Sequence, residues 1–150
     1  MLSLTSQYAL RAIAHLAAQP RDKMVSGQEL SRRTGIPRNY LSKILLPLGS
    51  AGIVEAVRGN SGGYRLAVPP ETTPIIRVIE LFERNMTKRA CLLGLRPVCS
   101  DANPCAAHRA WKPAKEAYFN LMESATLQDI ALARKSAPAR PAADAAHRRR

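Results

Sequence analysis

The sequence lacks a long run of apolar residues. Within its first twenty residues the apolar positions are interrupted by Gln7, Arg11 and His15, so neither a signal-peptide core nor a membrane-spanning helix fits. The chain also lacks the groupings of side chains that enzymes use, because we find no nucleophile beside a base, no phosphate-binding loop and no pair of carboxylates. We therefore expect a cytoplasmic protein that is not an enzyme.

Acidic residues are scarce. The 150 residues include 11 Asp and Glu against 23 Lys and Arg, which gives a formal net charge of +12. Basic residues outnumber acidic ones by 9 to 3 in residues 1–70 and by 6 to 1 in residues 134–150, but only by 8 to 7 in residues 71–133. A basic N-terminal half suits binding to DNA phosphates, although charge alone fits a solvated basic surface equally well.

Cysteines are few, and all three lie within fifteen residues. Disulfides are uncommon in a reducing compartment, so clustered cysteines are better interpreted as metal ligands or redox thiols. Cys91, Cys99, Cys105 and His108 form the pattern C-x7-C-x5-C-x2-H, which lacks the C-x2-C pairs of structural zinc sites. Three thiolates with one imidazole suit an iron-sulfur cluster. Zinc and free thiols remain the alternatives.

Periodicity and capping residues predict the elements of the N-terminal half. Ser26 and Glu29 have the spacing of a capping box, Gly35 permits a tight turn, and Pro37 suits a first helical turn. Pro47 lies inside the helix that follows, where we expect a kink or an early end. The predicted elements are helices over 6–19 and 26 to about 34, a third helix from Pro37 with the apolar stripe Leu41, Ile44, Leu45 and Leu48, and a β-hairpin of 53–57 and 64–67.

The second half of the chain is predicted to be helical around one irregular segment. The expected elements are a helix that begins at Thr73–Pro74 and fades near Asn85, an irregular segment over 87–105, a long amphipathic helix from His108, a short helix around 127–131, and a disordered tail after Arg134. We thus predict a mainly α fold with a small β-hairpin wing. Its parts are a winged helix-turn-helix domain over 1–70, a cluster-binding loop with dimerisation helices over 71–133, and a basic tail over 134–150.

Two helices followed by a hairpin, on the basic half of the chain, predict a DNA-binding module. In a winged helix-turn-helix the second helix of the pair enters the major groove. Arg38 and Asn39 at its start can read guanine and adenine, and Lys43 suits a phosphate. Arg58, beside a glycine in the hairpin loop, can approach the DNA backbone. The alternative is that these are solvated side chains of a module that binds another protein, but the placement of charge favours DNA.

Several short motifs resemble those of the IscR/NsrR/RirA regulators. The most specific one is Arg58-Gly59 followed by Gly62-Gly63-Tyr64-Arg65-Leu66-Ala67 in the predicted wing. With the others, the resemblance covers roughly residues 1–133. The other motifs are Tyr8-Ala9-Leu10-Arg11-Ala12, Leu30-Ser31, Gly35-Ile36-Pro37, Tyr40-Leu41, Ala51-Gly52-Ile53-Val54 and Thr126-Leu127-x-Asp129.

This resemblance implies a homodimeric regulator that binds an inverted repeat in double-stranded DNA. Ser42 stands where some members of the family have a discriminating Glu. The residues expected at the DNA are Gln28, Arg38, Asn39, Tyr40, Ser42, Lys43, Arg58, Gly59 and Asn60. The long C-terminal helix is expected to pair between subunits, and its interface residues would be Trp111, Ala114, Tyr118, Leu121 and Met122.

The resemblance also implies a set of cluster ligands. Members of the IscR type hold a [2Fe-2S] cluster with three cysteines and a histidine, and Cys105-x-x-His108 resembles that ending. NsrR-like members recruit a carboxylate from the partner's first helix for a [4Fe-4S] cluster, but the matching position here is Gln7, a poor ligand. We therefore expect [2Fe-2S] in preference to [4Fe-4S], although Cys91 and Cys99 are separated by seven residues where those groups commonly have five.

The predicted function is transcription regulation, with repression preferred. The stimulus that acts on the cluster would be nitric oxide, oxygen, iron or cluster supply. One alternative is a zinc- or thiol-dependent regulator. A second is an iron-sulfur carrier protein, against which the wing motif and the basic N-terminal half argue.

Overall fold

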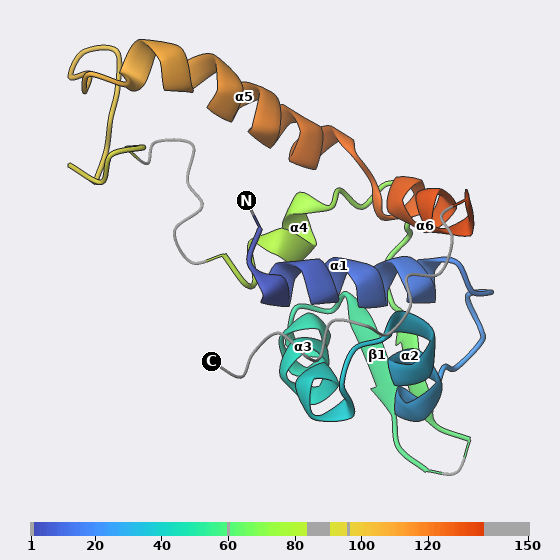
Figure 1. Cartoon of the computed structure of the whole chain (residues 1–150). Helices are drawn as coiled ribbons and strands as arrows, with labels where there is room; N and C mark the ends of the chain where they lie inside the picture. Colours follow the sequence, from blue (N-terminus) through green and yellow to red (C-terminus); the bar gives the residue numbers. More distant parts are fainter. Residues whose placement is uncertain (1, 60, 84–90, 96, 137–150) are drawn as a thin grey trace.

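The structure is a computed structural model that describes residues 2–59, 61–83, 91–95 and 97–136, with the side chains of 134–136 left aside. Figure 1 shows most elements gathered around α1, while α5 extends away from them. The described residues are mainly helical with one two-stranded sheet, as predicted. The elements are α1 Leu4–Ala17, α2 Gly27–Thr34, α3 Arg38–Ser50, β1 Val54–Val57, β2 Gly63–Leu66, α4 Ile76–Ile79, α5 His108–Ser124 and α6 Leu127–Ser136.

Helix α1 forms the centre of this fold. Its first turn is capped by the Ser3 hydroxyl, which accepts a hydrogen bond from the backbone N–H of Ser6. The helix contacts α2, α3, β2, α4 and α6, and Ile13 on it is fully buried. Each large apolar side chain that is buried in this way stabilises the fold by about 1.5–3 kcal/mol, so the elements around α1 share a substantial core.

The helix-turn-helix follows the predicted local rules. At the start of α2 the Ser26 hydroxyl accepts a 3.1 Å hydrogen bond from the backbone N–H of Glu29. At its end Gly35 has a φ of 70°, a left-handed conformation that favours glycine. The predicted apolar stripe of α3 is buried, which turns the opposite side of the helix toward solvent. Its members are Leu41, Ile44, Leu45 and Leu48.

Pro47 does not end α3 early, which was one of the two outcomes expected there. The helix continues to Ser50, and the Pro47 carbonyl accepts a 3.0 Å hydrogen bond from the backbone N–H of Ala51. A proline removes only its own N–H donor, so the lost bond is the one to the Lys43 carbonyl. Because Leu48 is fully buried directly after it, core packing holds the last turn in the helical conformation.

The wing is an antiparallel hairpin that is tied to the loop before α2. Val54 pairs with Leu66, and Val57 pairs with Gly63. The next residue, Tyr64, exchanges backbone hydrogen bonds of 2.9 and 2.8 Å with Val25. A Cβ atom on Gly63 would lie 2.5 Å from the Val25 carbonyl oxygen, and one on Gly62 would collide with the Val57 carbonyl. The two glycines of the wing motif are therefore required by close backbone approach.

The C-terminal elements differ in length from the prediction. Helix α4 has only four residues, Ile76–Ile79, and the predicted end near Asn85 lies outside the described residues. Helix α6 extends to Ser136, so residues 134–136 are helical rather than part of a disordered tail, and residues 137–150 lie outside the description. Among the described residues, no helix combines the length and the apolar character that crossing a membrane requires.

Candidate metal centre and DNA-binding surface

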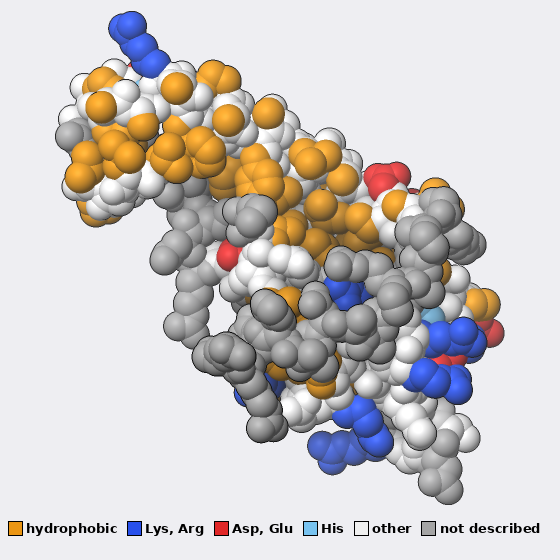
Figure 2. Space-filling view, in the orientation of Figure 1, with side chains coloured by type: hydrophobic (Ala, Val, Ile, Leu, Met, Phe, Trp, Pro, Cys, Tyr) orange, Lys and Arg blue, Asp and Glu red, His pale blue; other side chains and the backbone are white. Residues whose placement is uncertain are grey.

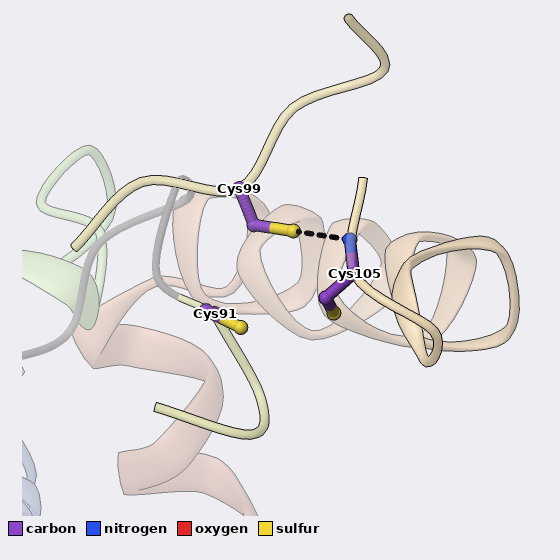
Figure 3. A group of neighbouring side chains, drawn as sticks. All are labelled: Cys91, Cys99 and Cys105. Atoms are coloured by element: carbon purple, nitrogen blue, oxygen red, sulfur yellow. Dashed lines mark hydrogen bonds between the residues drawn. The ribbon is translucent and has the colours of Figure 1, made fainter. Parts of the chain in front are cut away.

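The three cysteines come together in space although the chain between them is irregular. Cys91 and Cys99 lie in the loop before α5, and Cys105 lies three residues before its first turn. Their sulfur atoms are all within 4.8 Å of one another, and Figure 3 shows the three side chains converging on one region. Cys99 is buried and the other two are half-buried. The predicted cysteine ligands therefore form a single site.

A hydrogen bond and close packing connect the thiols of this site. The backbone N–H of Cys105 donates a 3.3 Å hydrogen bond to the sulfur of Cys99, drawn as a dashed line in Figure 3. Desolvation raises the pKa of the Cys105 thiol above its ordinary value of 9.0, and the thiols of Cys91 and Cys99 add to the increase. Neighbouring thiolates repel one another, whereas a metal ion neutralises them and deprotonates its ligands.

His108, the predicted fourth ligand, lies beside the thiol group. It is the first residue of α5, and only 6% of its surface is exposed. Its Nδ1 atom is 3.2 Å from the sulfur of Cys99, and its Nε2 atom is 3.0 Å from the Oδ1 atom of Asp101. The set of mutually adjacent ligand atoms consists of the three sulfurs. The imidazole therefore faces this set from the Cys99 side.

Asp101 is a part of the site that sequence reasoning missed. Its carboxylate bridges His108 and the ammonium group of Lys112, which lies one turn further along α5. Hydrogen bonds from Lys112 and His108 hold the pKa of Asp101 below its ordinary value of 3.8. The signal available in the sequence was a single carboxylate between Cys99 and Cys105, seven residues before His108. Position alone did not show which side chain it would contact.

A cavity of about 200 Å³ opens between the cysteine loop and α5. Cys99, His108 and Phe119 are among its lining residues. A cavity therefore adjoins the Cys99 side of the thiol site. The remaining lining residues are Ser100, Asp101, Lys112, Lys115 and Glu116.

Most of the predicted DNA-contacting residues share the exposed side of the helix-turn-helix and its wing. On α3 the side chains of Arg38, Asn39 and Lys43 are exposed, and so is Ser42 one turn into the helix. Gln28 on α2 and Arg58 and Gly59 at the tip of the wing are exposed as well. Asn60 lies outside the described residues. The described members are thus available to a partner molecule.

Tyr40, which was expected at the DNA, is less accessible than the other residues of that set on α3. It is half-buried, its hydroxyl lies 3.0 Å from the Thr5 hydroxyl, and its ring stacks edge-on against Tyr8 at 5.4 Å. The ammonium group of Lys43 lies 6.0 Å from the centre of the Tyr40 ring. Tyr40 therefore connects α3 to α1, and its ring also lies near the ammonium group of Lys43.

The predicted dimer-interface residues on α5 fall into two groups. Met122 is almost fully buried against the core of its own chain, together with Phe119, so it is not a free interface residue. Leu121, by contrast, is 60% exposed. The other three predicted residues, Trp111, Ala114 and Tyr118, are exposed or half-buried. Figure 2 shows apolar side chains along α5 and around the cysteine loop.

The thiol site lies far in space from the residues of α3 and the wing that were predicted to contact DNA. In Figure 1 the cysteine loop is at the far end of α5, away from α3 and the wing. Helix α5 connects them within the described residues, since it begins at the cysteine loop and its C-terminal part packs Phe119 and Met122 into the common core. It therefore offers one physical connection between the two sites.

The fold and the exposed helix-turn-helix define the class of protein as a winged-helix, DNA-binding transcription regulator. The chain belongs to the Rrf2 family, described as an iron-dependent transcriptional regulator, which matches residues 2–133. A putative HTH-type transcriptional regulator of Aquifex aeolicus is 35% identical to it over 132 residues, which is 87% of this chain and 90% of the relative. The HTH-type transcriptional regulator NsrR of Halalkalibacterium halodurans is 33% identical over 131 residues, or 86% and 90%.

Solved structures support the same fold. The global cysteine regulator CymR of B. subtilis superimposes with a TM-score of 0.74 at 22% identity, covering 89% of this chain and 97% of that one. IscR of T. potens has a TM-score of 0.71 at 24% identity and covers 93% of both chains. The predicted fold class and family resemblance are confirmed.

Proposed function

We propose that this Rrf2-family regulator binds its operator as a homodimer and that an iron-sulfur cluster held by Cys91, Cys99, Cys105 and His108 controls its affinity for DNA. The observation that carries the proposal is the convergence of three thiol sulfurs within 4.8 Å, next to the buried imidazole that begins α5. A [2Fe-2S] cluster matches three thiolates and one imidazole better than a [4Fe-4S] cluster does.

The chemistry of the donor set fits such a group. Thiolates are the preferred ligands of iron-sulfur clusters, and replacement of a thiolate by imidazole raises the potential. When bound, the cluster would supply an iron-sulfide centre that nitric oxide, oxygen or iron shortage can modify. Where NsrR-like members have a carboxylate ligand this chain has Gln7, whose amide donates a 2.9 Å hydrogen bond to the Leu2 carbonyl. An amide is a poor ligand, so we propose His108 as the fourth ligand.

The chain's own residues offer a path from this site to the DNA surface. His108 begins α5, and Phe119 and Met122 on the same helix pack into the core around α1. Beyond α5, the backbone around Thr126 pairs with Pro74, and α6 packs on α1. A change in the cysteine loop therefore reorients α5 relative to the winged part of the chain.

In a dimer this reorientation acts on two DNA half-sites at once. Two recognition helices must match half-sites one helical turn apart, so a change in their relative angle removes base contacts. Each paired contact of the kind that Arg38 or Asn39 can make discriminates bases by about 1–3 kcal/mol. Losing two of them changes operator affinity by more than tenfold.

A zinc- or thiol-dependent regulator is the second candidate, and it has one observation in its favour. Three sulfurs within 4.8 Å are also close enough to bind one zinc ion, for which Zn–S distances are about 2.3 Å. Zinc has no visible charge-transfer absorption, whereas an iron-sulfur cluster absorbs strongly. Metal analysis and an absorption spectrum of the anaerobically purified protein therefore separate the two.

The test is operator binding by loaded and metal-free protein under anaerobic conditions, with DNA from upstream of the chain's own gene. We expect iron and visible absorption in the wild type, and operator affinities that differ at least about tenfold, or 1.4 kcal/mol, between the two forms. The variant with Cys91, Cys99 and Cys105 all replaced by Ala should keep the metal-free affinity, while Ser100→Ala, in the same loop, should behave as wild type. Equal affinities of loaded and metal-free wild type would exclude the sensing role.

A further inference from the structure

We infer that Asp101 is a positioning residue that holds the His108 ring so that its Nδ1 atom, rather than Nε2, is the ligand atom of the metal site. This inference rests on the proposed function, because it concerns the fourth ligand of the same site. In this arrangement Asp101 and Lys112 together orient the His108 ring, and Nδ1 is the nitrogen that binds the metal.

The tautomer of His108 follows from its two neighbours. An ionised carboxylate has only acceptors, so the Nε2 atom that lies 3.0 Å from Asp101 Oδ1 must bear a proton. In a neutral imidazole the other nitrogen then has a free lone pair. That nitrogen, Nδ1, lies 3.2 Å from the sulfur of Cys99. The ring thus presents its lone pair to the thiol group.

Lys112 holds the carboxylate in place. Its ammonium group pairs with the second oxygen, Oδ2, of Asp101, so each oxygen has its own partner. Since Lys112 lies one turn after His108 on α5, helix and loop are joined on both sides of the imidazole. The buried ring cannot turn over without breaking the Asp101 bond. A carboxylate that accepts the second N–H of a metal-binding histidine orients the ring and typically strengthens metal binding by 10–100-fold.

The experiment compares Asp101→Ala, Asp101→Asn and His108→Ala with wild type in the full chain, with Glu80→Gln as control. Glu80 is an exposed carboxylate at the end of α4, outside the cysteine loop and its cavity. The readout is pulsed electron paramagnetic resonance of the reduced cluster in protein labelled with ¹⁵N at Nδ1 or Nε2 of histidine. We expect a strong nitrogen coupling in the wild type that changes with the Nδ1 label and is absent in His108→Ala.

The Asp101 variants should then distinguish a positioning role of Asp101 from a role in folding alone. Asp101→Ala should weaken this coupling and lower cluster affinity by about 10- to 100-fold. Asp101→Asn should retain the coupling, because an amide oxygen still accepts the Nε2–H bond. Glu80→Gln should match the wild type. An unchanged coupling and affinity in Asp101→Ala, or a coupling that follows the Nε2 label, would overturn the inference while leaving a cluster-dependent regulator intact.

A second measurement needs no cluster. Long-range ¹⁵N–¹H NMR of the metal-free protein reports which ring nitrogen bears the proton, with His108→Ala identifying the resonance. We expect a proton on Nε2 in the wild type and a mixture of tautomers in Asp101→Ala. A proton on Nδ1 in the wild type would refute the positioning role. If the tautomer is as expected but the loaded and metal-free forms bind the operator equally, the proposed function fails instead.

Discussion

The winged body and the cysteine arm of this chain are stabilised in different ways. We define the winged body as α1–α4, the hairpin and α6, and the cysteine arm as the described residues from 91 to 118. The body has capped helices and a buried apolar core around Ile13. The arm exposes apolar side chains, among them Leu92, Leu95 and Val98. The proposed function accounts for this difference, because a metal and a second subunit would cover and stabilise the arm, whereas the body has a core of its own.

The largest effect should follow from opening the core of the body. Leu48→Ala removes a fully buried side chain from α3 and should lower the free energy of unfolding by about 2–5 kcal/mol. Leu46→Ala on the same helix is the control, because Leu46 is 73% exposed and its loss should cost less than about 0.5 kcal/mol. Chemical denaturation of the three proteins measures both values. Similar losses for the two variants would contradict the assignment of the core.

The part of α5 that joins the arm to the body should respond to a change on its exposed side. Leu121→Asp places a charge on the exposed apolar face of α5 and should weaken dimerisation by about 30-fold or more, as expected for a central interface residue. Analytical ultracentrifugation measures the dimer dissociation constant, and circular dichroism checks the helices. Asn120→Asp adds the same charge at the preceding exposed position and should have a much smaller effect. A dimer that tolerates Leu121→Asp would show that another surface pairs the subunits.

On the body's exposed face, Arg38 and Lys43 should affect DNA binding in different ways. Arg38→Ala should weaken operator binding by about 1–3 kcal/mol and relax the preference at one base pair. Lys43→Ala should weaken binding to all sequences alike and reduce the slope of log affinity against log salt by about 1. Anisotropy titrations at several salt concentrations distinguish the two. If both variants lose the same affinity for every DNA sequence, Arg38 and Lys43 both contact phosphates rather than bases.

The smallest effect should come from the contact that joins the body's first helix to the end of α4. Glu83 accepts hydrogen bonds of 2.7 Å from the Ser3 backbone and 2.6 Å from the Ser6 hydroxyl. Partial burial raises the pKa of Glu83, but these bonds outweigh burial and leave the pKa below its ordinary value of 4.5. Glu83→Gln should therefore cost about 1 kcal/mol of stability at neutral pH.

The pH dependence of that cost has a definite sign. A depressed carboxyl pKa contributes stability above the unfolded-state pKa, and this contribution is lost as the pH falls through the folded-state pKa. The difference in unfolding free energy between wild type and Glu83→Gln should thus be constant from pH 7 to about 5 and shrink at lower pH. A difference that persists unchanged below that range would show that the charge of Glu83 is not involved.

The two regions also differ in how well the sequence predicts them. In the body, the Ser26 cap, the left-handed Gly35 and the glycines of the wing are local signals, and each predicted its structure correctly. The stripe of α3 was also correct, because helical period and core burial agree. Of the two outcomes expected at Pro47, a kink or an early end, the early end was wrong, since the packing of the following residue is a tertiary effect that the sequence pattern does not contain.

In the arm, the spacing of the cysteines and His108 predicted which residue types would form the site, but not the hydrogen-bond partners of those residues. The convergence of the cysteines agrees with the predicted pattern. The bond between Asp101 and His108 depends on how the loop folds back on α5, which no periodicity reveals. For the same reason Met122 was assigned to a dimer interface although it packs on its own chain, and Tyr40 was assigned to the DNA surface without its contact to Thr5 being foreseen. The apolar side chains of an amphipathic helix indicate which face is buried, but they do not indicate which part of the molecule, or which other molecule, packs against that face.

The central claim is that the state of the cysteine arm sets the DNA affinity of the winged body. Its most direct test follows cluster absorbance and the anisotropy of a labelled operator in one anaerobic sample while the cluster is removed stepwise with nitric oxide. We predict that both signals change together with the same midpoint, and that the variant without Cys91, Cys99 and Cys105 shows neither change. Complete loss of the absorbance with operator binding unaltered would contradict the claim.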